Sequence, residues 1–438
     1  MMTRNQKSRS KGVPSGKALA PVVIFVILNS LGFPGKFGQV FGESIGTVTE
    51  YASFALQIGT MLFSSGEGAM EYRLVDLKAK YGALYAMTAV FFALSMFGSR
   101  EPAAQFVTCA RFSVTVFFAL WIVDRYAPEE ILHLICSAQA IFIAFTAVFM
   151  VLFPNMAFVH EVGDNDFTGL LQTKNNAAAE LSCCILLQLA LFHIRRGEKK
   201  AVSSRFVLLL VVQTLLLFLC NATGAFFCAM IPAFYLLFFE KHMGEERRLS
   251  LGIIYVTASV GFVVLALSIL PVFSPFFEAI GKDATLTGRV PLWQQIVRVM
   301  TEHNTMTGYG FGMFWRDRSA VALVHSAFSR NSFMGSMTTG AHNVILELWL
   351  NVGLIGVGAY FAAMVAVTSR IRQLSEPGYI LCAAYILWFL LFGLTERAFS
   401  PYQYQTLFLM IAMGAACEKK PLPARRGGRK EDAKTTED

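Results

Sequence analysis

Residues 130–153 read EILHLICSAQAIFIAFTAVFMVLF, and after Glu130 this stretch holds no acidic residue, lysine or arginine. Its length matches the roughly 20 residues that an α-helix needs to cross the hydrocarbon core of a bilayer. Apolar segments of comparable length recur from one end of the chain to the other. The sequence therefore predicts an all-α polytopic membrane protein with twelve transmembrane helices.

The composition excludes an ordinary soluble enzyme. Of the 438 residues, 55% are hydrophobic and only 15% are charged, whereas a soluble domain carries about a quarter charged residues. The net charge of +8 would suggest a nucleic-acid partner in a soluble protein. Here the basic residues lie mostly in short segments between apolar runs, where they set membrane topology. No nucleic-acid partner is therefore expected.

The predicted spans divide the chain into two groups of transmembrane helices separated by one long outer loop. The spans lie near residues 18–34, 46–64, 81–98, 107–124, 130–153, 173–194, 204–220, 222–239, 250–272, 343–368, 378–395 and 400–416. The predicted parts are the N-terminus (1–18), transmembrane helices 1–9 (19–272), the outer loop (273–341), transmembrane helices 10–12 (342–416) and a disordered tail (417–438). The basic N-terminus resembles a signal peptide, but no small-residue cleavage site clearly follows it, so we interpret the first span as retained.

The positions of lysine and arginine predict the orientation. With the N-terminus in the cytoplasm, 26 of the 37 basic residues fall in cytoplasmic segments, ten in outer segments and one, Arg111, in a span. Cytoplasmic segments of membrane proteins carry such an excess, so both termini are predicted to be cytoplasmic. Six of the ten outer basic residues lie in the 273–341 loop, against this bias, which indicates another use: Lys282, Arg289, Arg298, Arg316, Arg318 and Arg330.

A helix is expected in this loop. Thr287-Gly288-Arg289 precedes Pro291-Leu292-Trp293, and proline suits the first position of a helix. Apolar residues then recur every four positions from Leu292 to Met300, with polar residues opposite, which predicts an amphipathic helix. Two placements fit the pattern equally well: the membrane surface, or packing against the transmembrane bundle.

The segment Gly308-Tyr309-Gly310-Phe311-Gly312, followed by Phe314-Trp315, is a second motif of the loop. It lacks the strand and the helix that surround a dinucleotide-binding glycine motif. We therefore interpret it as a tight aromatic turn without direct chemistry.

His342 is the strongest single candidate for chemistry. It stands in Ala341-His342-Asn343 at the mouth of the tenth predicted span, which places it in the first turn of a helix, where the helix dipole disfavours an imidazolium ion. A neutral imidazole that faces the outer compartment is able to accept a proton from a hydroxyl group. The alternative is a hydrogen-bonded interfacial histidine without a catalytic role. His303 and His325, also in the loop, have no stronger context.

Arg111 lies inside the fourth predicted span. An arginine in a membrane needs an acidic partner, water or an anionic ligand. The alternatives are therefore ligand binding or a pair with a buried acid such as Glu180 or Glu347.

Two further basic residues lie at outer ends of predicted spans. Arg397 follows Glu396 between the last two spans, and the pair suits either ligand contact or anchoring at the interface. Lys174 begins the sixth span and either sets topology or contacts phosphate. Asp164-Asn165-Asp166 comes closest to a metal-binding Asp-x-Asp motif, but we do not favour it as a metal site.

At the loop motifs the chain resembles the O-antigen ligase and polymerase family of bacterial membrane glycosyltransferases. The resemblance rests on Thr287-Gly288-Arg289 with Trp293, on Gly308-Tyr309-Gly310 with Phe314-Trp315, and on His342-Asn343 before a span. The residues of these motifs are most similar to those of exopolysaccharide polymerases of the succinoglycan type. The stretch from Thr287 to Gly356 covers about a sixth of the chain, and the order and spacing of its short motifs are fairly specific.

This resemblance implies a lipid-linked donor, an oligosaccharide on undecaprenyl diphosphate, and a polysaccharide acceptor at the periplasmic face of the bacterial inner membrane. It assigns catalytic roles to His342, as the base, and to Arg289, which would stabilise the departing diphosphate. Contacts with the diphosphate or glycan would come from Arg111, Arg397, Lys174, Trp293, Tyr309 and Asn343. The expected transfer is inverting and needs neither a nucleotide sugar nor a metal or other cofactor. A chain-length regulator and export machinery are the further partners that it admits.

Three alternatives stay open beside polymerisation. An O-antigen ligase would use the same donor chemistry and transfer the glycan to a lipid A-core acceptor. A transporter or flippase of lipid-linked sugars would also want Arg111 and a basic cavity, although no internal repeat or matched pair of broken helices is visible. A non-catalytic export scaffold would not depend on His342.

Overall fold

The computed structural model describes most of the predicted spans and the second half of the outer loop. The described residues are 16–42, 44–63, 79–98, 101–161, 164–198, 203–240, 250–269, 272, 286, 288–326, 328, 340–369, 371–397, 399–400 and 403–418. Most of the predicted cytoplasmic N-terminus and tail, and Thr287, Lys282 and Arg330 of the predicted loop, lie outside these ranges.

A helix lies over each of the twelve predicted apolar segments. Before the loop these helices are α2 (Gly16–Ser30), α4 (Ser44–Phe63), α6 (Gly82–Gly98), α7 (Pro102–Arg125), α8 (Pro128–Leu152), α10 (Lys174–Gly197), α11 (Ser204–Leu219), α12 (Thr223–Phe234) with its π-helical end η2 (Tyr235–Glu240), and α14 (Leu251–Ser268). After the loop they are α19 (Val344–Thr368), α20 (Glu376–Thr395) and α21 (Tyr404–Ala416), with η6 (Ile371–Gln373) between α19 and α20.

Shorter elements connect these helices. They are α3 (Lys36–Phe41), α9 (Pro154–Ala157), α16 (Arg289–Glu302), η5 (Phe314–Arg316) and α17 (Arg318–His325). In the described ranges the strands are β1 (Phe158–Glu161) and β2 (Asp164–Phe167), which pair as an antiparallel hairpin.

Length and hydropathy agree with a membrane protein. Among the described residues, six helices are long and apolar enough to cross a membrane: α7, α8, α10, α14, the region from α19 to η6, and α20. Five shorter apolar helices accompany them, within α2, α6, α11, α12 with η2, and α21. Large apolar side chains face outward, for example Leu208 with 64% and Phe218 with 61% of its surface exposed. The prediction of an all-α polytopic membrane protein is confirmed, while the count of twelve spans stays a prediction.

The bundle is organised around α10, α20 and α21. In their apolar windows, 83% of α10 and 78% of α20 is buried, against 28% of α14 at the periphery. Hydrogen bonds join the central helices: the Trp388 indole donates to the Ser182 hydroxyl (3.0 Å), and the Tyr385 hydroxyl donates to the Gln405 carbonyl (2.7 Å). Such bonds supplement van der Waals packing where lipid offers no hydrophobic driving force.

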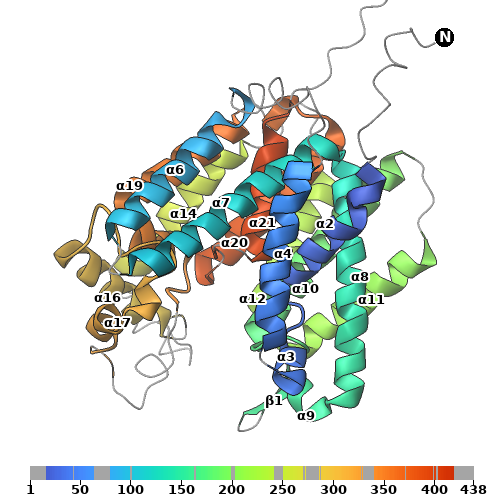
Figure 1. The fold of residues 1–438 in the computed structure, drawn as a ribbon, viewed down its shortest axis with the longest axis horizontal. Helices are drawn as coiled ribbons and strands as arrows, with labels where there is room; N and C mark the ends of the chain where they lie inside the picture. The colour runs from blue at the N-terminus through green and yellow to red at the C-terminus, as the bar shows by residue number, and fades with distance from the viewer. Residues whose placement is uncertain are drawn as a thin grey trace, which may run out of the picture.

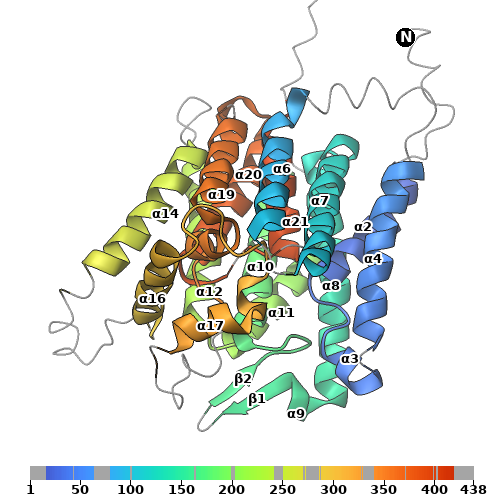
Figure 2. The same cartoon turned by 60° about the vertical axis from the view of Figure 1, so that its left-hand side comes forward.

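The two ends of the bundle differ. Figures 1 and 2 place the start of α2 at one end, and the β1–β2 hairpin, α9, α16 and α17 at the other. At the first end Lys80 forms ion pairs with Asp124 (3.2 Å) and Glu418, and so joins three segments that the sequence assigns to the cytoplasmic side. The second end, called the outer end below, holds the segments predicted to face outward.

The predicted amphipathic helix is α16, which begins at Arg289, two residues before the predicted start. Its buried face includes Leu292, Trp293 and Ile296. This face packs in one cluster with Ala266 of α14 and with Leu346 and Leu350 of α19. Of the two predicted placements, the structure therefore shows packing against the bundle.

The glycine-rich motif of the loop is inserted against a break in α19. Gly353 has φ 65° and ψ −176°, which interrupts the helix. Beside the break, the amides of Tyr309 and Gly310 donate to the carbonyls of Leu350 and Asn351 (2.9 Å each), and the Leu354 amide donates to the Thr305 carbonyl (3.0 Å). The loop thus satisfies backbone groups that the broken helix leaves free, and the motif forms the predicted tight turn.

Substitution of Gly353 with alanine should destabilise the protein strongly. Gly353 lies in a region of backbone conformation that is essentially reserved for glycine, and a Cβ atom there would overlap the backbone of Met306 and Thr307. We expect Gly353→Ala to lower the free energy of unfolding by about 1–3 kcal/mol from backbone strain alone. Thermal unfolding of the purified protein in detergent measures this change. Gly358→Ala is the control, because a Cβ on Gly358 of the same helix meets nothing within 4 Å.

Candidate functional site

The two residues predicted to be catalytic meet at a carboxylate. Glu396, at the end of α20, forms an ion pair with Arg289, the first residue of α16. The other carboxylate oxygen, Oε2, lies 3.0 Å from Nδ1 of His342. The side chains of Arg289, His342 and Glu396 are 22%, 25% and 18% exposed. They are therefore held in place by packing but remain open to a ligand.

The contact with Glu396 determines which nitrogen of His342 is available. An ionised carboxylate only accepts hydrogen bonds, so His342 donates from Nδ1–H to Glu396. In the neutral ring, Nε2 then carries the free lone pair. This is the arrangement in which an acid orients a histidine that acts as a base.

Arg289 retains capacity for an anionic ligand. Its contact with Glu396 uses Nη2, whereas a guanidinium group carries five N–H donors. Planar pairs of such donors suit phosphate oxygens. The contact with Glu396 therefore leaves other donors of Arg289 for a further acceptor.

A strained backbone and a buried network hold His342. Its φ is +49°, a left-handed conformation that is uncommon for a residue other than glycine. The preceding residue, Ala341, accepts a hydrogen bond from the Trp293 indole at its carbonyl (2.7 Å) and donates from its amide to the buried Glu347 (2.8 Å). Glu347 also accepts from the Trp315 indole (3.1 Å). The strain is maintained by these contacts, as is common at functional sites.

The placement of His342 in the first turn of a helix was wrong by two positions. α19 begins at Val344, and Asn343 is its N-cap, with a side-chain oxygen that accepts from the amides of Ile345 and Leu346 (3.0 and 3.1 Å). Asparagine is a favoured N-cap residue because it satisfies amides that the first turn leaves free. The side-chain Nδ2 of Asn343 also donates to the Leu394 carbonyl (2.9 Å). This bond connects the residue after His342 with the end of α20.

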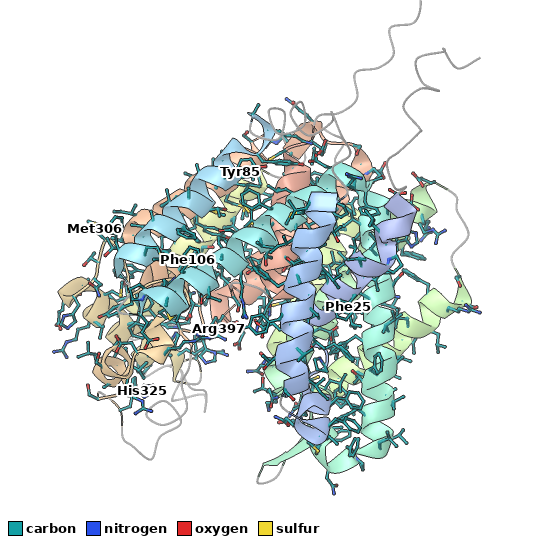
Figure 3. The ribbon with its side chains drawn as sticks, viewed as in Figure 1. Phe25, Tyr85, Phe106, Met306, His325 and Arg397 are labelled. Carbon is teal, nitrogen blue, oxygen red and sulfur yellow. The ribbon has the colours of Figure 1, made fainter. Side chains whose placement is uncertain are left out.

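Arg397 lies near this group, whereas three other predicted ligand residues have packing roles. A Cβ placed on Gly340 would lie 3.4 Å from Cδ of Arg397, so Arg397 lies against the chain two residues before His342. Its side chain is exposed at the outer end, as Figure 3 shows. Trp293, Tyr309 and Asn343 are 0%, 8% and 1% exposed. Their contact with a ligand stays a prediction.

Arg111 and Lys174 are held by acids outside the His342 group. Arg111 forms an ion pair with Glu50 and lies over the ring of Tyr51 (4.8 Å), both on α4. Of the two alternatives for Arg111, the structure thus shows a pair with an acid, and that acid is Glu50, which was not one of the two examples named from the sequence. Lys174 pairs with Asp166 of the hairpin (2.5 Å).

The described residues contain no group of three or more histidine, cysteine, aspartate or glutamate side chains placed to hold a metal ion. Asp166, from the motif closest to a metal site, is engaged with Lys174.

The sequence analysis did not single out Glu396 as a partner of Arg289 and His342, and considered it only together with Arg397. One signal was available. A negative charge at the C-terminal end of a helix is unfavourable, so an acid there needs cations nearby. Glu396 has them in Arg289 and His342.

Replacement of Glu396 with glutamine should weaken catalysis without abolishing it. The amide keeps the shape of the side chain but no longer attracts Arg289 or selects the Nδ1–H tautomer of His342. A hydrogen bond to a charged group is typically worth about 1.5–3 kcal/mol, which corresponds to about 10–100-fold in rate. We expect a fall of this size in the rate of any reaction of the purified protein that uses His342 as a base. A merely structural role would instead lower the unfolding temperature of Glu396→Gln and leave the rate per folded molecule unchanged.

Comparisons with known proteins agree with the motifs. Residues 206–361, which include Arg289 and His342, match the O-antigen ligase family. Over 133 residues the chain is 30% identical to the exopolysaccharide production protein ExoQ of Rhizobium meliloti (strain 1021). That match covers 30% of this chain and 29% of the relative, so it spans less than a third of either protein. The predicted resemblance to the O-antigen ligase and polymerase family is confirmed.

Proposed function

With the match of residues 206–361 to the O-antigen ligase family as the premise, we propose that this membrane protein is a glycosyltransferase that polymerises oligosaccharide repeat units. Each unit is carried on undecaprenyl diphosphate, and the product is an exopolysaccharide or O-antigen. The reaction takes place at the periplasmic face of the bacterial inner membrane, and both termini are cytoplasmic. The similarity to an exopolysaccharide production protein supports polymerisation over other reactions of this class.

The observation that carries the proposal is the arrangement of His342, Glu396 and Arg289. Nε2 of His342 removes the proton from the attacking hydroxyl group of the acceptor sugar. The oxygen then forms a bond with the anomeric carbon of the donor as the bond from that carbon to the diphosphate oxygen breaks. The diphosphate leaves with the electron pair, and the charge that it gains is stabilised by Arg289. Attack from the face opposite the leaving group inverts the anomeric configuration.

Glu396 has two roles in this scheme. It fixes Nδ1–H of His342, so that Nε2 faces the substrate, and it stabilises the imidazolium that forms when the proton arrives. It also fixes Arg289 through one guanidinium nitrogen and leaves the others for the diphosphate. Two arginines near the leaving group, Arg289 and Arg397, supply the positive charge that this step requires.

A reconstituted assay tests the function. Purified protein in lipid vesicles receives the undecaprenyl-diphosphate-linked repeat unit of its host, without nucleotide, added metal or ion gradient. We expect glycans of increasing length that remain attached to the lipid carrier. Transfer only to an added lipid A-core acceptor would instead identify a ligase. Movement of the intact lipid across the membrane without a new glycosidic bond would identify a flippase, and retention of the anomeric configuration would exclude direct displacement.

A further inference from the structure

A polar cavity lies at the outer end of the bundle. Its lining does not include Arg289, His342 or Glu396. Its volume is about 330 Å³, within the range of about 300–1,000 Å³ that is typical of small-molecule sites. It is an open cavity lined by residues at the end of α2, the start of α4, the start of α10 and the start of α21. The side chains that define its chemistry are Asn29, Ser30, Glu50, Asn176, Gln403 and Gln405.

The lining of this cavity is rich in amides and hydroxyl groups. Among the described residues that line it there is no lysine or arginine, and the charged one is Glu50. Glu50 is itself paired with Arg111, which lines a smaller adjoining cavity together with Gln57. The lining therefore carries no excess positive charge. A diphosphate would meet a carboxylate here, whereas the hydroxyl groups of a sugar would find both donors and acceptors.

Buried polar atoms point to a ligand of this kind. Gln405 is 7% exposed, and its Oε1 accepts no hydrogen bond from any described residue. The same holds for Oε1 of Gln57, which is 9% exposed in the adjoining cavity. Buried polar groups without partners are costly, so a hydroxyl group of a ligand that donates to Gln405 or to Gln57 would stabilise the site.

The wall of the cavity is firmly built. The turn from Gly32 to Gly35 forms one side of it. The next residue, Lys36, is 6% exposed, and its ammonium donates to the Met156 carbonyl (2.5 Å) and to the Thr168 hydroxyl (2.6 Å). Burial lowers the pKa of Lys36. Because its bonds go to neutral oxygens behind the wall, Lys36 positions the turn and is not itself a lining residue.

The cavity lies within reach of the proposed catalytic group. Glu396 and Gln403 are seven residues apart in one connecting segment, so they are separated by roughly 25 Å at most. Arg397, the residue after Glu396, is labelled in Figure 3. An oligosaccharide of several sugars is long enough to extend from one to the other.

We infer that this cavity binds uncharged sugars of the glycan, at a distance from the bond that is made, and thereby holds the growing chain between transfers. The inference rests on the proposed function, because it assigns the ligand from the same glycan. In this inference the amide and hydroxyl side chains of the cavity bind sugar hydroxyl groups, whereas the proposed diphosphate site does not involve these side chains. It also assigns Arg111 a positioning role, since Arg111 holds Glu50 in the cavity wall.

The test fills the cavity without disturbing the fold. Gly46 lines the cavity, and a Cβ placed on it meets nothing within 4 Å. Gly46→Leu therefore places an apolar side chain in the opening. Gly261→Leu in α14 is the matched control, because a Cβ on Gly261 also meets nothing within 4 Å. Gln405→Leu is a second cavity variant, which removes the buried side-chain oxygen Oε1 that accepts no hydrogen bond from a described residue.

Binding is measured with an oligosaccharide fragment of the surface polysaccharide of the host, free of lipid and phosphate, by ligand-observed NMR on the purified protein. We expect Gly46→Leu to weaken binding at least about tenfold, which corresponds to about 1.4 kcal/mol. Gly261→Leu and His342→Ala should both bind as the wild type does. The inference would be overturned if Gly46→Leu bound the fragment as the wild type does. It would also be overturned if Gly46→Leu lost binding of undecaprenyl diphosphate and not of the fragment.

The outcomes for the cavity and for the enzyme can be separated. If His342→Ala still produces long polymer, the proposed function fails whatever the cavity binds. If His342→Ala is inactive and Gly46→Leu binds the fragment normally, only the cavity inference fails. In the expected case Gly46→Leu makes shorter chains and raises the KM for the glycan acceptor, while its affinity for undecaprenyl diphosphate is unchanged.

Discussion

His342→Ala is expected to abolish formation of long polymer and to leave single repeat units on the lipid carrier. The substitution removes the group that accepts the proton of the attacking hydroxyl, and general base catalysis typically contributes about 10²–10⁴-fold to a rate. Donor binding should persist, because Arg289 and its partner Glu396 are retained. The decrease should therefore appear in kcat, with little change in the affinity for undecaprenyl diphosphate. The host gene is deleted, variants are reintroduced at matched membrane levels, and surface and secreted polysaccharides are sized.

His303→Ala is the matched control for this experiment. His303 is an exposed histidine at the end of α16, in the same loop, and its removal should leave polymer length unchanged. Normal polymer from His342→Ala would show that the histidine is structural and would contradict the proposed mechanism. The strain that lacks the whole gene gives a further outcome. If long chains form in that strain but stay on the lipid carrier, the protein is a ligase.

The general architecture could be predicted because membrane insertion acts on local sequence. An apolar segment such as 130–153 must form a helix in a bilayer, since its backbone polar groups have no water to bond to. The helices of the structure therefore follow the apolar segments closely, and α8 (Pro128–Leu152) covers nearly all of this one. The amphipathic period of residues 292–300 likewise predicted the buried face of α16, although not the surface against which it packs.

The partners of the charged residues could not be predicted in the same way. Glu396 is 54 residues from His342 and 107 residues from Arg289 in the sequence, yet it contacts both. Arg111 and Glu50 are 61 residues apart. Such pairs depend on which helices become neighbours, and hydropathy contains almost no information on that choice. Their discovery required the packed bundle.

The break in α19 shows a third kind of limit. A glycine within an apolar run is tolerated in a membrane helix, so Gly353 gave no sign of interrupting one. In the structure the interruption provides the backbone carbonyls to which Tyr309 and Gly310 bind. The loop and α19 therefore determine each other's conformation, and together they fix the position of His342, eleven residues before Gly353.

Arg289→Ala is expected to cause the second large loss, through the leaving group. Without the guanidinium, the charge that develops on the diphosphate has one fewer donor at the transition state. Removal of one such donor typically costs about 10²–10³-fold in kcat. Because Arg289 also contacts the ground-state donor in the proposed scheme, the affinity for undecaprenyl diphosphate should decrease as well. This combined effect on rate and binding distinguishes Arg289→Ala from His342→Ala, which should affect the rate alone.

Arg289→Lys separates the charge from its geometry. Lysine keeps the positive charge and can still pair with Glu396, but it is a point charge without the planar pair of donors that suits a diphosphate. Its activity should fall between those of the wild type and Arg289→Ala. Arg298→Ala on the same helix is the control, because the Arg298 side chain is 67% exposed and pairs only locally with Glu302. If Arg289→Ala bound undecaprenyl diphosphate with full affinity and Arg298→Ala did not, the diphosphate would lie on the outward face of α16, and the assignment of Arg289 to the leaving group would be wrong.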